Sequence, residues 1–105
     1  MFIKNFDKLA ITPQRKIVLQ LIETAYSSIQ PENAINSSIT VDRSILKIKN
    51  QTFNLEDFNR VFLVGFGKGS AKNSKLIEEK LGDWLTEGYV IDTNPETFSK
   101  IKFTQ

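Results

Sequence analysis

Residues 60–70 read Arg-Val-Phe-Leu-Val-Gly-Phe-Gly-Lys-Gly-Ser, and this stretch sets the fold class of the chain. Its first half, 60–64, is a continuous run of strand-forming residues, which is typical of a strand buried on both faces of a parallel sheet. Its second half is a glycine-rich loop, followed by apolar residues at helical spacing up to Leu81 and a stop at Gly82. A second apolar run, 88–91, comes next. The order strand, loop, helix, strand predicts one βαβ unit and an α/β fold.

Helical patterns occupy the region before residue 40. Apolar residues at helical spacing predict a short amphipathic helix over 2–10. A longer helix is predicted over 13–29, with Thr12 as its N-cap and a proline at its first position. It stops before Pro31, which starts the next element, and 34–39 indicates one or two more helical turns.

Two further strand signals complete the chain. Residues 45–48 and 52–55 flank Asn50-Gln51 in a hairpin-like arrangement, although the turn lacks glycine. The spacing of Ile101 and Phe103 indicates a third parallel strand near the end.

Composition bounds the function. The chain has 105 residues, 40% of them hydrophobic and 25% charged, with a formal net charge of +2, so we expect one globular domain and no nucleic-acid partner. It contains no Cys and no His, which excludes thiolate nucleophiles, Cys-based zinc sites and an imidazole base. The longest uncharged apolar stretch, 61–67, is too short for a membrane helix. No membrane partner and a cytoplasmic location are therefore expected.

A parallel sheet of two or three strands needs helices on both faces. The chain offers few helices to cover it, so we expect bare apolar faces and strand edges. This indicates the front portion of a larger α/β enzyme.

The glycine loop is a candidate anion site. Unpaired N–H groups at a helix start attract anions, and Gly65, Gly67 and Gly69 would let a phosphate approach the backbone, with Ser70 as a further donor. The alternative is structural, because the same glycines permit a tight turn and close packing of helix on sheet. The P-loop pattern does not match, whereas the dinucleotide pattern GxGxxG fits except for Ser70 at the third glycine.

Asp92 lies 27 residues after Gly65, near the place where a dinucleotide fold carries its ribose-binding acid. It also suits the polar carboxyl edge of any parallel sheet. Neither the P-loop pattern nor the dinucleotide pattern explains Lys68 at its place in the loop. A cation near a helix start is unfavourable, because it faces the positive end of the helix dipole. A phosphoryl or carboxylate ligand would offset that cost. A solvated surface lysine is the alternative.

The sequence resembles the glycerate 2-kinases that carry a C-terminal MOFRL domain and an N-terminal domain of the DUF4147 type. Residues 29–34 resemble the family's helix ending Asp-Pro-(Glu)-x-Ala, and 61–71 resembles its strand and Gly-x-Gly-Lys loop. Leu-Gly-Asp at 81–83 and Gly-Tyr-Val at 88–90 follow in matching order. The resemblance covers essentially the whole chain.

The resemblance implies that residues 1–105 are the N-terminal portion of the family's large domain, a Rossmann-like α/β/α sandwich, with a leading helical segment and a small β-hairpin. It implies ATP-dependent phosphorylation of D-glycerate at its 2-hydroxyl, with ATP and Mg²⁺ as cofactors and Lys68 in the active site. The rest of the large domain, the MOFRL domain and every metal ligand would lie outside these residues. The fragment alone would then be inactive.

Two other functions stay open from the sequence. One is an NAD(P)-binding segment of an oxidoreductase such as a hydroxypyruvate reductase, and the other is a non-catalytic interaction module. Phe66 departs from the family pattern, which more often has a small residue there, so it bears on substrate choice. The sequence does not predict an oligomeric state.

Overall fold

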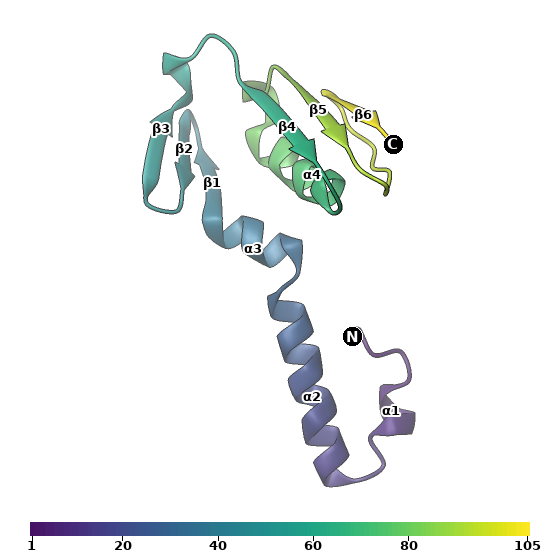
Figure 1. Cartoon of the computed structure of the whole chain (residues 1–105). Helices are drawn as coiled ribbons and strands as arrows, with labels where there is room; N and C mark the ends of the chain where they lie inside the picture. Colours follow the sequence, from purple (N-terminus) through teal and green to yellow (C-terminus); the bar gives the residue numbers. More distant parts are fainter. The chain divides into compact units, whose positions relative to one another are not determined.

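The computed structural model describes all 105 residues as two compact units, 1–34 and 35–105. The fold is α/β, with helices and two small sheets (Figure 1). The first unit contains α1 (Phe6–Leu9), α2 (Pro13–Ser28) and the start of α3 (Pro31–Ser38). These bounds confirm the predicted helix that begins at Pro13 and the new element at Pro31.

Helix α2 begins as its sequence predicts. The Thr12 hydroxyl oxygen accepts the N–H of Arg15 at 3.2 Å, and Pro13 occupies the first turn, where its missing N–H costs nothing. The apolar stripe of α2 is not buried, however. Its members are half or more exposed: Ile17, Val18, Leu21 and Ile22. Phe6 is the one buried hydrophobic residue of the unit.

The second unit opens with an antiparallel sheet of β1 (Ile39–Asp42), β2 (Ile45–Ile48) and β3 (Gln51–Asn54). The predicted hairpin is therefore confirmed as β2–β3, but a third strand, β1, extends it. The sequence had indicated helical turns up to Ile39 and no strand in this place. Its residues pair with β2 from Ile39 opposite Ile48 to Asp42 opposite Ile45, and such pairing over a distance overrides weak local helical spacing.

A parallel sheet follows, in the order β4–β5–β6. A short 3₁₀ turn, η1 (Leu55–Asp57), precedes this sheet. The strands of the sheet are β4 (Phe62–Phe66), β5 (Glu87–Ile91) and β6 (Ile101–Thr104). Helix α4 (Ser70–Leu81) and the 3₁₀ turn η2 (Gly82–Trp84) connect β4 to β5. The βαβ unit and the third strand predicted from the sequence are both confirmed.

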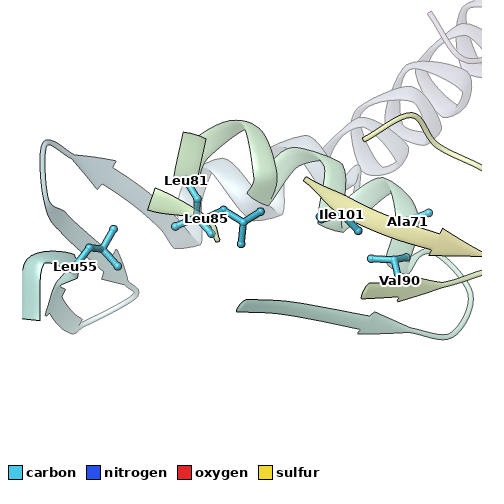
Figure 2. Packing of buried hydrophobic residues seen from close by; sticks show 6 residues of the cluster. All are labelled: Leu55, Ala71, Leu81, Leu85, Val90 and Ile101. Carbon is cyan, nitrogen blue, oxygen red and sulfur yellow. The ribbon is translucent and has the colours of Figure 1, made fainter. Parts of the chain in front are cut away.

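The core lies mainly between α4 and one face of the parallel sheet, and Leu55 of η1 extends it toward the antiparallel strands (Figure 2). Its buried members are Leu55, Ala71, Leu81, Leu85, Val90 and Ile101. Gly88 lets the strands approach there, because a Cβ at this position would lie 2.6 Å from the Leu63 carbonyl oxygen and 2.8 Å from Ile101 Cγ1. Only a residue without a side chain fits the centre of this sheet.

The opposite face of the parallel sheet is bare. Its apolar side chains are 49–79% exposed: Phe62, Val64 and Phe66 from β4, and Tyr89 and Ile91 from β5. Figure 1 shows α4 on one side of this sheet and no helix of the same unit on the other. The uncovered apolar face expected from the sequence is confirmed.

The connection from β5 to β6 contains no helix and depends on a buried carboxylate. Glu78 of α4 is 6% exposed, and its two oxygens accept the N–H groups of Ser99 at 3.0 Å and Lys100 at 3.1 Å. Lys100 in turn donates from Nζ to the carbonyl oxygens of Gly82 at 3.1 Å and Leu85 at 2.9 Å. The start of β6 is thereby fixed to both ends of the turn that follows α4.

We predict that Glu78→Ala destabilises the chain by about 1–3 kcal/mol, because two main-chain N–H groups lose their acceptor in a partly buried place. Glu79→Ala, an exposed neighbour on the same helix, is the control and should change stability by less than about 0.5 kcal/mol. Urea unfolding followed by the fluorescence of the one tryptophan, Trp84, measures both. Equal effects of the two substitutions would contradict the prediction.

Candidate functional site

The glycine loop joins β4 to α4 at the carboxyl ends of the parallel strands. Ligands of open α/β sheets bind at this edge. Gly67 and Gly69 have φ angles of +94° and +87°, a conformation that residues with a side chain rarely adopt. These two glycines shape the loop, and Lys68 stands between them.

Gly65 has a different role from the other two glycines. A Cβ there would lie 2.7 Å from Ser74 Oγ on α4 and 3.3 Å from Val90 Cγ2. Its bare backbone therefore allows the helix to pack closely on the sheet. The structural interpretation of the glycines therefore accounts for all three, with close packing at Gly65 and loop shape at Gly67 and Gly69, while the approach of a phosphate to this backbone stays a prediction.

The loop is fixed to the end of β5 by the carbonyl oxygen of Ile91. This oxygen accepts the N–H of Gly67 at 3.1 Å and the hydroxyl of Ser70 at 3.1 Å. A hydroxyl has a single hydrogen to donate, so in this structure the Ser70 hydroxyl donates to the protein and not to a ligand. Both ends of the loop around Lys68 are thus held by one main-chain acceptor.

Asp92 supplies the cap that α4 lacks. Gly69 is the N-cap residue and has no side chain to accept a helix N–H. The buried carboxylate of Asp92 does so instead, since Oδ2 accepts the N–H of Ala71 at 2.9 Å. Oδ1 accepts the N–H of Asn94 at 3.2 Å and lies 3.4 Å from the Thr93 hydroxyl.

These contacts determine the charge state of Asp92. The N–H of Ala71 is the largest cause that holds the pKa of this carboxyl below its ordinary value of 3.8, and the N–H of Asn94 acts in the same direction. Burial opposes them. The carboxylate is therefore ionised at neutral pH and lies against the positive end of α4.

Asp92 is not arranged to bind a ribose. Both of its oxygens already accept hydrogen bonds from the protein, and only 4% of the residue is exposed. The sequence presented it as a possible ribose ligand or as a polar strand end, and its capping role was missed. A glycine at the N-cap position was the available signal, because such a helix needs an acceptor from elsewhere in the chain.

Lys68 is the one charged residue of the loop. Its side chain is exposed and makes no hydrogen bond or ion pair. An unpaired ammonium beside a helix start attracts an anionic ligand at the carboxyl edge of the sheet. The loop therefore offers a positive charge on a fixed backbone. The buried N–H of Ala71 in the first turn of α4 already donates to Asp92.

The residues of this chain do not fit a divalent cation. No group of three or more Asp, Glu, His or Cys side chains is placed to hold a metal ion. The loop itself contains no carboxylate, and Asp92 is directed at N–H donors. None of the helices has the length and apolar character that crossing a membrane requires.

We predict that Asp92 stabilises the fold in a pH-dependent way. Because its pKa is lowered on folding, its contribution is present above pH 3.8 and is lost as the pH falls through the lower, folded value. Asp92→Asn should therefore lower the urea midpoint at pH 7, and the difference from wild type should shrink below about pH 4. The control Asp83→Asn changes an exposed carboxylate that caps no helix. A difference between Asp92→Asn and wild type that is constant from pH 7 to pH 3 would contradict the prediction.

Known proteins resemble this chain in sequence. "Glycerate 2-kinase" of Picrophilus torridus is 34% identical over 70 residues, and "Glycerate kinase" of Rattus norvegicus is 32% identical over 73 residues. These alignments cover 67% and 68% of this chain but 14% of each relative. The chain thus matches about one seventh of the length of these curated relatives.

A solved structure shares the fold. The PH0495 protein from Pyrococcus horikoshii OT3 has a TM-score of 0.71 to this chain at 19% identity, covering 88% of this chain and 21% of that one. The family described as "Domain of unknown function (DUF4147)" matches residues 17–105, which include both sheets and the glycine loop. This chain therefore belongs to the DUF4147 family.

Proposed function

We propose that residues 1–105 are the N-terminal portion of a glycerate 2-kinase. The complete enzyme would transfer the γ-phosphoryl group of ATP to the 2-hydroxyl of D-glycerate and release 2-phosphoglycerate and ADP. Two relatives named as glycerate kinases support this class of activity. The observation that carries the proposal is the unpaired Lys68 on a loop held at both ends, at the carboxyl edge of a parallel sheet.

The role of this segment in the reaction is electrostatic. Charge spreads over the oxygens of the phosphoryl group in the transition state, so catalysis depends on positioning and on fixed positive charge. The Lys68 ammonium supplies that charge, and the loop of Gly65, Gly67, Gly69 and Ser70 carries it. In this arrangement Gly65 seats the helix, Gly67 and Gly69 bend the loop, and Ser70 anchors its end to Ile91.

ATP and Mg²⁺ would be held largely by parts of the enzyme outside these residues. Mg²⁺ would neutralise phosphate charge when bound, and these 105 residues contain no cluster of carboxylates placed to hold it. An anionic group of either substrate fits the Lys68 side of the loop. The rest of the large domain and a C-terminal MOFRL domain complete the proposed site.

We expect Lys68→Met to lower kcat of the completed kinase on the order of 10²–10³-fold, as is typical when one preorganised charge or donor at a reacting centre is removed. Fold stability should change little, because Lys68 has no protein partner to lose. Lys47→Met, at an exposed lysine of β2, is the matched control.

Steady-state kinetics with varied ATP and glycerate distinguish the outcomes of that substitution. A raised KM with unchanged kcat would assign Lys68 to substrate recognition rather than to catalysis. Values of kcat and KM within about twofold of wild type would remove the physical support for the proposed kinase.

A second prediction concerns the segment by itself. Residues 1–105 should show no glycerate-dependent consumption of ATP, because no metal ligand set is present and the site needs residues from elsewhere. A coupled assay for ADP release by the purified 105-residue chain measures this. Turnover above the background without glycerate would contradict the proposal that the site is incomplete.

A further inference from the structure

We propose that Asp92 is a positioning residue for Lys68, acting through a clamp that fixes the backbone of the glycine loop. The inference rests on the proposed function, since it concerns how the proposed catalytic lysine is held. Asp92 does not touch the substrate in this proposal. It acts only through the loop.

The clamp consists of three hydrogen bonds from the loop and the helix start to consecutive residues of one strand end. Gly67 N–H and Ser70 Oγ both donate to the Ile91 carbonyl oxygen at 3.1 Å. The N–H of Ala71 donates to Asp92 Oδ2 at 2.9 Å. Lys68 lies between these attachments, so the path of the chain through Lys68 is fixed on both sides.

Asp92 is itself held firmly. Its N–H donates to the Thr104 carbonyl oxygen of β6 at 3.2 Å, and its Oδ1 accepts the N–H of Asn94. Asp92 thus connects the helix start to the ends of β5 and β6, through its carboxylate on one side and its main-chain N–H on the other. Lys68 has no side-chain partner of its own, so the placement of its ammonium depends on this backbone support.

The charge of Asp92 adds a second effect. Its carboxylate already offsets the positive end of α4 and takes an inner N–H group. A phosphate that entered this helix start would meet a like charge there. Attraction of the substrate at this loop therefore comes from Lys68, and a displaced Lys68 has no substitute.

The conservative variant Asp92→Asn separates positioning from mere folding. Asparagine has one acceptor oxygen and one NH₂ group. It can therefore accept the N–H of Ala71 or that of Asn94, but not both, and its NH₂ group faces the other N–H as a second donor. In the completed kinase we expect Asp92→Asn to lower kcat at least tenfold, with both KM values within threefold of wild type. Asp83→Asn, at the opposite end of α4, is the matched control and should leave kcat unchanged.

A double-mutant cycle with Lys68→Met tests whether Asp92 acts through the lysine. In the Lys68→Met background, Asp92→Asn should lower kcat by less than twofold. An equal loss in both backgrounds, or no loss with Lys68 present, would overturn the proposal. If Asp92→Asn does not yield folded enzyme, Ser70→Ala releases the other part of the clamp, and the same cycle and criteria apply to it.

Amide hydrogen exchange in the completed kinase provides a readout that does not depend on activity. Asp92→Asn should speed exchange of the amides from Gly67 to Ala71 at least tenfold and leave the last turn of α4 unchanged. Unchanged loop amides would overturn the proposal whatever the kinetics show. If the loop amides exchange faster but Lys68→Met leaves kcat and KM unchanged, the proposed function is overturned. The conclusion that Asp92 fixes the loop backbone would then stand.

Discussion

The buried carboxylate of Asp92 joins α4 to the end of β5, and the main-chain N–H of the same residue donates to Thr104 of β6. Helix α4 starts at a glycine N-cap, so without this acceptor its first turn would keep an unpaired N–H in a buried place. The carboxylate provides the missing cap from 21 residues further along the chain. At the other end of the β5–β6 connection, the Glu78 carboxylate likewise accepts main-chain N–H groups, those of Ser99 and Lys100. Two acidic side chains thereby fix the two ends of a β5–β6 connection that contains no helix.

This arrangement differs from the glycine loops that bind phosphate with the helix start itself. In those loops the ligand accepts the N–H groups of the first helical turn. Here the protein's own Asp92 carboxylate accepts the first-turn N–H of Ala71, and the Ile91 carbonyl oxygen accepts the N–H of Gly67 in the loop and the hydroxyl of Ser70. The glycines therefore serve the shape of the loop and the packing of the helix, and in the proposed function the Lys68 side chain is the group that attracts the anion.

The sequence predicted the central part of the fold because its signals there are local. A run of strand formers, glycines at a bend and apolar residues at helical spacing identify β4, the loop and α4 without any knowledge of distant contacts. Strand β1 was missed, because its pairing with β2 decides its structure. The stripe on α2 was predicted correctly as apolar, yet spacing alone does not indicate whether a partner covers it.

The candidate site was predictable to a lesser degree. Lys68 stood out because its charge conflicts with its position, and that argument needs only neighbouring residues. The functions of Gly65 and Asp92 depend on Ser74 and Ala71, which are brought close only by folding. Spacing had made Asp92 a possible ribose ligand, and its observed partners are N–H donors of the protein itself.

The two edges of the parallel sheet differ in their chemistry, which has a consequence for self-association. On the bare face, the β4 edge presents Phe62, Val64 and Phe66, whereas the β6 edge presents Lys102 and Thr104. Charged side chains on an edge strand discourage further strands from pairing with it, and β4 carries none between Phe62 and Phe66. For the 105-residue chain by itself, unwanted strand addition, the first step toward aggregates, is thus directed to β4, and Val64→Lys is the substitution that would protect this edge.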